Sequence, residues 1–330
     1  MARSWRAVHR IAAAEAMRAH RELGIDTTRP IDPFFALERS GVLVMRQPMD
    51  RLAGAYLPAN LVDGSPPGVL INVSHPPSRQ RYTAAHELWH HRRDRDLIFD
   101  AETEWIARGE DGGPERERFA EAFAAWFLMP RQLVAVTMDL LGLVAEQLDE
   151  QGVYVLSLEF GTSYAATLHH LAGMGLIPRQ AEARLQKASP QAIKRALGAI
   201  DVAADAWKDV RLVGPRERAR AVEAVEGDAL VVEVPEIPSS GYLWRAADVP
   251  EILALVRDEY RPAVPDALGG EGIHRFVFRV LAAGRQPIRL ELARPWQRGK
   301  TVETRDIEVV AEPQPTPGIV HPSSLVEAAA

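Results

Sequence analysis

The sequence contains no cysteine. This absence excludes disulfides, thiol nucleophiles, thiolate zinc sites and iron–sulfur clusters, so any metal site must use His, Asp or Glu side chains. Long hydrophobic runs are also missing, since no stretch approaches the ~20 apolar residues of a membrane span. Charged residues interrupt the N-terminal segment too often for a signal peptide. We therefore expect a cytoplasmic protein without a membrane partner.

An excess of positive charge is missing as well. The chain has 39 Lys and Arg against 45 Asp and Glu, which gives a formal net charge of -6 at pH 7. A protein that binds nucleic acid over a broad surface needs an electropositive face, so we expect no direct DNA binding. The length of 330 residues favours about two domains of roughly 150 residues each.

The two halves of the chain differ in pattern. Before residue 200, short β-type runs mix with helical segments, whereas after residue 205 short β-rich runs alternate with turns. This segregation predicts an α+β domain over 1–200, a linker over 201–222 and an all-β sandwich over 223–313, while the Pro-rich residues 314–330 are typical of a disordered tail. We expect helices over 5–24, 33–39, 78–91, 114–130, 131–147, 152–160, 163–174 and 178–198, and strands over 42–46, 53–57, 69–73, 229–234, 242–246, 252–258, 274–281, 287–293 and 302–312.

One helical segment carries the pattern H-E-x-x-H, in which His86 and His90 lie four residues apart. On a helix this spacing places both imidazoles on one face, where they can reach one ion. Glu87 lies beside that face, where a general base can take a proton from a metal-bound water. The flanking residues are apolar, and burying these polar groups without a partner would be costly. We therefore predict a zinc site, with Glu87 as the catalytic residue.

A catalytic zinc site usually has three protein ligands. The next helix offers Glu115, Glu117 and Glu121, and the spacing alone leaves all three open as the third ligand. The run 69–73 leads towards the zinc helix, so it could also pair with a substrate strand through its edge.

Three segments, R-Y-T-A-A-H-E-L-W-H, E-R-F-A-E-A-F-A-A-W-F-L-M-P and L-S-L-E-F-G-T-S-Y-A-A-T-L-H-H-L-A-G-M-G-L-I, resemble the ImmA/IrrE-type zinc metallopeptidases over about residues 5–180. The resemblance implies a zincin-like α+β domain with a helical extension. It also implies His86, His90 and Glu117 as zinc ligands and Glu87 as the base. Phe119 and Glu121 stand where many relatives have Glu and Asn.

The family resemblance further implies an endopeptidase whose substrate is a regulatory protein, often a helix-turn-helix repressor that controls stress or mobile-element genes. The turn Phe160–Ser163 between two helical segments also looks like a helix-turn-helix corner. We interpret it as a structural corner, because the following helix has little Lys or Arg. We treat the adjacent His169 and His170 as surface or core residues.

The second half resembles the chagasin-type inhibitors of papain-like cysteine peptidases over residues 227–312. The resemblance implies an immunoglobulin-like sandwich with three loops at one end, and a cysteine peptidase as partner. Ile237, Ser239 and Ser240 stand where the family usually has Asn and two Thr. The partner-binding residues carried over are Pro238, Ser239, Ser240, Gly241, Tyr242, Gly270, Arg294 and Trp296.

The sequence is therefore compatible with three functions. The first is a zinc endopeptidase whose C-terminal sandwich recruits substrate, senses a signal or regulates the same chain. The second is a binding protein that inhibits or captures a cysteine peptidase. The third, a DNA-binding regulator, depends on the helical corner alone. We favour the endopeptidase, because the ligand set and the base are all present.

Overall fold

The computed structural model describes residues 4–59, 64–93, 115–198, 208–217, 221–264, 270–297, 299–313 and 319–320. Contacts within the chain divide it into two compact units. Unit 1 contains Met1–Thr137, Leu156–Glu182 and Thr316–Ala330, and unit 2 contains Met138–Val155 and Ala183–Pro315. Each unit is thus formed by segments that are not contiguous in the sequence.

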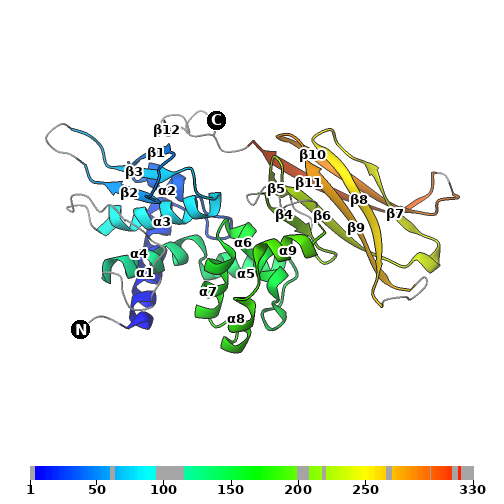
Figure 1. Cartoon of the computed structure of the whole chain (residues 1–330), viewed down its shortest axis with the longest axis horizontal. Coiled ribbons are helices and arrows are strands. Elements are labelled where there is room, and N and C mark those ends of the chain that lie inside the picture. The colour runs from blue at the N-terminus through cyan, green and yellow to red at the C-terminus, as the bar shows by residue number, and fades with distance from the viewer. Residues whose placement is uncertain are drawn as a thin grey trace. The chain divides into compact units, whose positions relative to one another are not determined.

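Unit 1 contains a small mixed sheet with the strand order β12-β1-β3-β2. β1 is parallel to β3, whereas β2 is antiparallel to β3 and β12 is antiparallel to β1 (Figure 1). Because β3 has a partner on both sides, the predicted edge pairing of residues 69–73 is wrong, and β2 is the edge strand nearest that segment. The strands are β1 (Leu43–Gln47), β2 (Gly54–Leu57), β3 (Gly68–Asn72) and β12 (Ile319–Val320).

The helices begin and end at residues suited to those positions. Ser4 accepts a hydrogen bond from the backbone of Ala7, and Gly24 adopts a left-handed conformation after the last turn of α1. Both features satisfy backbone groups that a helix end leaves open. The helices are α1 (Trp5–Leu23), α2 (Pro33–Arg39), α3 (Pro77–Arg93), α4 (Glu115–Leu128), α5 (Arg131–Leu140), α6 (Glu150–Phe160), α7 (Tyr164–Gly173), α8 (Arg179–Leu185) and α9 (Pro190–Ala196), with short 3-10 turns η1 (Ala145–Gln147) and η3 (Pro238–Ser240).

Two predicted helices are shorter than expected. The helix expected over 131–147 ends at Leu140, because Gly142 has a positive φ of 65°. The single helix expected over 178–198 is divided into α8 and α9, since Pro190 opens a new helix and cannot continue an old one. No helix among the described residues has the length and apolar character needed to cross a membrane.

Unit 2 contains a sandwich of two four-stranded sheets, with orders β5-β11-β10-β7 and β4-β6-β9-β8. This confirms the predicted fold class, an α+β region followed by an all-β immunoglobulin-like sandwich. β4 lies within the segment predicted as a linker, where it pairs in parallel with β6. The strands are β4 (Val210–Val213), β5 (Val222–Val225), β6 (Ala229–Glu236), β7 (Leu243–Asp248), β8 (Leu253–Pro262), β9 (Gly272–Val280), β10 (Gly284–Ala293) and β11 (Thr301–Glu312).

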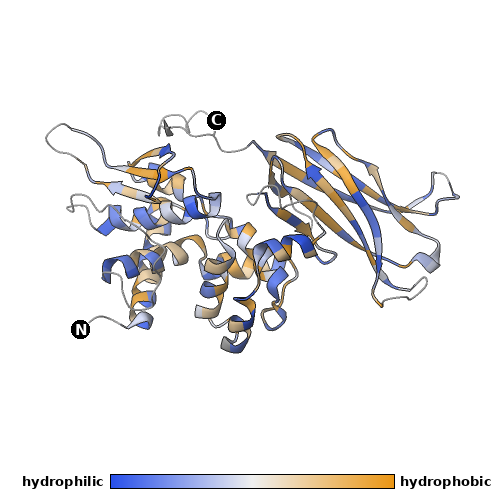
Figure 2. Ribbon diagram, in the orientation of Figure 1, coloured by the Kyte–Doolittle hydropathy of each residue, from blue (hydrophilic) through white to orange (hydrophobic). Residues whose placement is uncertain are grey.

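The sandwich core is built from alternate residues of both sheets. Leu230 and Phe276 from one sheet and Trp244 and Ile288 from the other belong to one buried cluster. This follows from the two-residue period of a strand, which puts every second side chain on the inner face. Hydrophobic residues run along the strands of both sheets in Figure 2.

A buried polar network joins helical residues of unit 2 to the sandwich. The Tyr154 hydroxyl donates to Asp209 Oδ1 at 3.2 Å and accepts from the backbone N–H of Val210 at 3.0 Å. Lys194, which is 5% exposed, reaches Asp209 Oδ1 at 2.7 Å. Burial is the main reason that the pKa of Tyr154 is raised well above its usual range. The helices therefore form part of the same folded unit as the strands.

Candidate functional site

The two histidines of the H-E-x-x-H pattern lie one turn apart on α3. His86 is 1% exposed and His90 is 5% exposed. Their Nε2 atoms are 3.1 Å apart. The helical spacing predicted this proximity, since residues four apart share a face.

Aromatic packing holds α4 against α3. The ring of Trp89 on α3 stacks on Phe119 at 5.6 Å and contacts Phe123 at 5.4 Å between centroids. Phe119 and Phe123 are among the buried residues of α4. Burial of such large rings fixes how the two helices meet, and with it the position of any side chain one turn away.

This packing places Glu117 at the histidine pair. Its Oε2 lies 3.2 Å from His86 Nε2 and 3.7 Å from His90 Nε2. Its other oxygen, Oε1, accepts a hydrogen bond from Arg116 Nε at 3.2 Å. Arg116 thereby orients the carboxylate so that one oxygen faces the two imidazoles.

The spacing of the three atoms fits a tetrahedral metal ion. A zinc ion with bonds of about 2.0–2.1 Å to nitrogen and oxygen holds its ligand atoms about 3.3 Å apart. Here the separations are 3.1, 3.2 and 3.7 Å. Two imidazoles and one carboxylate are also a donor set typical of catalytic zinc with one open position. In the part of the chain that the structure describes, this is the only group of three or more His, Asp or Glu side chains with converging ligand atoms.

The other two acids considered as third ligand lie outside this cluster. Glu115 is exposed at the start of α4. Glu121 is half-buried, and its backbone oxygen accepts a hydrogen bond from the Tyr82 hydroxyl at 2.8 Å. Of the three candidates, the structure brings only Glu117 to the histidines.

Glu87 is 3% exposed and follows His86 directly on α3. Its Oε1 faces strand β2, where a Cβ added to Gly54 would stand 3.5 Å away. The carboxylate thus faces the edge strand of the sheet, and its role as a general base stays a prediction. A buried carboxylate of this kind is oriented by its surroundings rather than by solvent.

Sequence reasoning did not single out Gly54, Tyr56 or Arg116. The Tyr56 hydroxyl lies 3.2 Å from His91 Nδ1, and both residues are buried beside the cluster. His91 directly follows His90, and this was a signal in the sequence that could have been used. Gly54 and Tyr56 on β2 carry no such signal, because their position near α3 depends on how the sheet packs against this helix.

The helical corner lies inside unit 1. Gly161 adopts a positive φ of 61° between α6 and α7. His170 is 3% exposed and bonds the backbone oxygen of Met129 at 3.0 Å, whereas the His169 side chain is 75% exposed. Burial lowers the pKa of His170 to about 3. These positions agree with the interpretation of both residues as core and surface histidines.

The first predicted partner loop is a compact turn. Pro238, Ser239 and Ser240 form η3, and Gly241 follows with a φ of 80°. Ser240 Oγ donates to the backbone oxygen of Ile237 at 2.6 Å and accepts from the backbone of Tyr242 at 3.2 Å. Serine therefore closes this turn, while Ile237 stays 45% exposed.

The structure brings this loop next to the predicted residues after β10. The Arg294 guanidinium lies 4.5 Å from the centre of the Tyr242 ring, and the Trp296 ring packs against Gly241. Trp296 is 68% exposed. Gly270 accepts a hydrogen bond from the Tyr260 hydroxyl at 2.7 Å, and the rest of its loop, 265–269, lies outside the described residues. The exposed Trp296 ring thus lies beside the turn at Gly241, and Arg294 is partly buried.

Two segments of the chain match protein-family models. Residues 37–172 match the model of the IrrE N-terminal-like domain, and residues 223–309 match the model of the chagasin family peptidase inhibitor I42. Both matches confirm the resemblances stated for the sequence. No curated protein matches the chain.

Three solved structures are similar to about a third of the chain. The cysteine protease inhibitor EhICP2 from Entamoeba histolytica is 22% identical, with a TM-score of 0.28, over 32% of this chain and 97% of its own. Amebosin is 19% identical, with a TM-score of 0.27, over 32% of this chain and 98% of its own. PbICP-C, in its complex with falcipain-2, is 16% identical, with a TM-score of 0.24, over 32% of this chain and 92% of its own.

Proposed function

Because an IrrE N-terminal-like domain here holds the converging atoms of His86, His90 and Glu117 beside a buried Glu87, we propose that the protein is a zinc-dependent endopeptidase. The single observation that carries this proposal is the separation of 3.1–3.7 Å among the three ligand atoms. The substrate is a regulatory protein, such as a helix-turn-helix repressor, as the family resemblance implies.

Each residue has a defined role in this proposal. His86, His90 and Glu117 would hold zinc, which when bound supplies Lewis acidity for peptide-bond hydrolysis. Glu87 accepts a proton on its carboxylate and later returns it to the leaving amine. Arg116 positions Glu117 through its hydrogen bond to Oε1.

The sandwich would serve the peptidase by recruiting substrate, sensing a signal or regulating the same chain. The exposed Trp296 and the turn at Gly241 support a binding role, because large exposed aromatics beside Gly-rich turns commonly contact partners. A binding module in the same chain would raise the local concentration of substrate at the metal centre.

The metal site is tested with two matched substitutions on α4. We expect Glu117→Gln to lose most of the bound zinc, because a neutral amide replaces the charged ligand. Glu121→Gln is the control, since it removes an acid of the same helix that lies outside the cluster. Zinc content of the purified full chain is measured by mass spectrometry. Equal zinc content in both variants would refute the assignment of Glu117.

The reaction is tested with Glu87→Gln. We expect this variant to keep its zinc and its melting temperature but to lose proteolysis, because only the proton acceptor is removed. Cleavage is read as new protein N-termini in a host-cell lysate treated with either form. Generic peptides are a poor substitute, since a selective endopeptidase ignores them. Undiminished cleavage by Glu87→Gln would overturn the proposed function.

The second candidate function is capture of a papain-like cysteine peptidase. The match of residues 223–309 to the chagasin family model favours it. The test is a titration of papain with the full chain, followed by residual activity. Inhibition that is lost in Trp296→Ala would support this function, whereas full papain activity at a large excess of the chain would exclude it for papain.

A further inference from the structure

A buried carboxylate joins the two ends of the first predicted partner loop. Glu236 is the last residue of β6, Trp244 is the second residue of β7, and residues 237–242 connect the two strands. Glu236 is 4% exposed, and its Oε2 accepts a hydrogen bond from the backbone N–H of Trp244 at 2.6 Å. The indole N–H of Trp244 donates to the backbone oxygen of Pro235 at 2.9 Å. Two hydrogen bonds therefore close the base of this loop.

The same carboxylate connects the two sheets of the sandwich. β6, β8 and β9 belong to one sheet, whereas β7 belongs to the other. His274 on β9 lies with its Nδ1 3.0 Å from Glu236 Oε2 and its Nε2 2.6 Å from Asp258 Oδ1 on β8. The His274 ring also stacks on the core residue Phe276, at 4.5 Å between centroids. Glu236 thus has a polar partner in each sheet, and because it is buried, the loss of either partner would be costly.

His274 brings a second loop into this network. The loop over 263–271 joins β8 to β9, and the backbone N–H of Ala263 donates to the backbone oxygen of Glu271 at 2.9 Å. Tyr260, which lies opposite His274 in the register of β8 and β9, donates its hydroxyl to the backbone oxygen of Gly270 at 2.7 Å. The strand that carries His274 therefore begins at a loop whose base is closed by hydrogen bonds.

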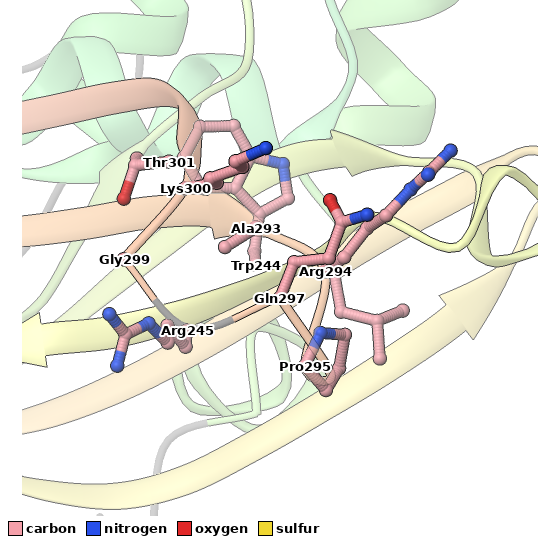
Figure 3. A pocket seen from close by; sticks show the side chains of 10 residues that line it. Trp244, Arg245, Ala293, Arg294, Pro295, Gln297, Gly299, Lys300 and Thr301 are labelled. Atoms are coloured by element: carbon pink, nitrogen blue, oxygen red, sulfur yellow. The ribbon is translucent and has the colours of Figure 1, made fainter.

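Trp244 connects the first loop to the loop after β10. It lines a cavity together with Arg294 and Pro295 of that loop (Figure 3). The Trp296 ring from the same loop packs against Gly241 of the first loop. Trp244 itself is 5% exposed and belongs to the sandwich core. A displacement of Trp244 would therefore move the first loop and the loop after β10 relative to each other.

We propose that Glu236 is a positioning residue for the loop surface of the sandwich, which consists of the first loop, the loop over 263–271 and the loop after β10. Its carboxylate, held between Trp244 and His274, fixes the three loops in the arrangement that a protein partner binds. This inference rests on the proposed binding role of the sandwich. Loops that are fixed in advance lose less conformational freedom when a partner arrives, so Glu236 strengthens binding without touching the partner.

The position of the loop is tested by hydrogen exchange of the Trp244 amide in the full chain, measured by mass spectrometry with single-residue fragmentation. Glu236→Met keeps the length of the side chain but removes the acceptor. We expect the amide to exchange at least about tenfold faster in this variant, as for the loss of a hydrogen bond to a charged group. Glu236→Gln keeps an acceptor oxygen, so the rate should rise only about fivefold. The control is Glu308→Gln, a partly exposed carboxylate of β11 that pairs with Arg285, and it should stay within about twofold of the wild type.

The consequence for binding is tested by titrating papain with the same full-length variants, well below their melting temperatures. We expect Glu236→Met to weaken inhibition at least about tenfold, because its loops must be ordered during binding. Glu236→Gln should recover most of the lost affinity. A residue that only stabilised the fold would lower the melting temperature and leave the affinity at this temperature unchanged.

Two results would overturn the proposal. The first is a Trp244 amide that exchanges at the same rate in Glu236→Gln as in Glu308→Gln, a comparison that holds even if Glu236→Met does not fold. The second is equal inhibition of papain by Glu236→Met and the wild type, since the loops would then be placed without this carboxylate. Full papain activity at a large excess of the wild-type chain would instead exclude capture of papain, and the exchange rates would still decide whether Glu236 holds the loop.

Discussion

Substitution of Gly54 tests most directly how α3, the helix that carries His86 and His90, is positioned. It lies on β2 where this strand passes α3, and an added Cβ would overlap Thr83 Cγ2 and stand 2.8 Å from the backbone oxygen of Leu70. The same Cβ would be 3.5 Å from Glu87 Oε1. Gly54→Ala therefore forces β2 and α3 apart beside the proposed base.

The size of the effect follows from the atoms that must move. Inserting a methyl group into a packed site costs about 1–3 kcal/mol. The Leu70 oxygen belongs to the central strand, so it cannot move aside as a flexible side chain could. For a unit of this size, about 2–4 °C of melting temperature corresponds to each kcal/mol. We expect Gly54→Ala to lower the melting temperature of unit 1 by roughly 2–12 °C.

Two further variants make this prediction specific. Gly54→Ala combined with Thr83→Ser removes the overlapping Cγ2 and should recover part of the lost stability, as a double-mutant cycle would show. Gly173→Ala is the matched control, because a Cβ there meets nothing within 4 Å. Melting is followed by calorimetry of the full chain, and zinc affinity by competition with a chelator. A Gly54→Ala protein as stable as Gly173→Ala would refute the proposed packing.

Three shorter predictions concern other sites. The pKa of His170 is lowered to about 3, so between pH 6.5 and about pH 3 the unfolded state binds a proton that the folded state does not. As the pH is lowered through this window the folded state loses stability, by about 2 kcal/mol at pH 5. The stability of His170→Gln should therefore depend less on pH in acid, whereas His169→Gln should match the wild type. Tyr154→Phe leaves a buried amide of β4 unpaired and should destabilise unit 2 by about 1–3 kcal/mol in denaturant melts. A fragment of residues 215–313 lacks β4, so it should unfold at lower denaturant than a fragment of 183–313, and equal midpoints would contradict this.

The candidate metal site could be predicted from the sequence because its geometry is mostly local. A spacing of four residues on a helix brings His86 and His90 together without help from the rest of the fold. The position of Glu117 is not local, and spacing left three acids open. The family resemblance favoured Glu117, and the packing of Phe119 and Phe123 on Trp89 is the physical reason that this acid reaches the histidines.

Strand order and short strands could not be predicted in the same way. Residues 69–73 have the composition of a strand in the centre or at the edge of a sheet, and only the pairing with β1 and β2 decides between them. β4 is a run of four residues whose strand conformation depends on its parallel partner β6. Local patterns carry no information about such partners, since a strand is stabilised by pairing across the sheet.

The hydrogen-bonding capacity of the cluster explains why its arrangement favours a cation. A neutral imidazole has one N–H donor and one acceptor nitrogen, and a carboxylate only accepts. His86 Nε2 lies close to both His90 Nε2 and Glu117 Oε2, yet one proton on it can serve only one of these contacts. His90 Nε2 lies 3.7 Å from Glu117 Oε2, which is too long for a hydrogen bond. A divalent cation satisfies all three lone pairs at once, and this is the physical basis for favouring a metal site over a hydrogen-bonded core.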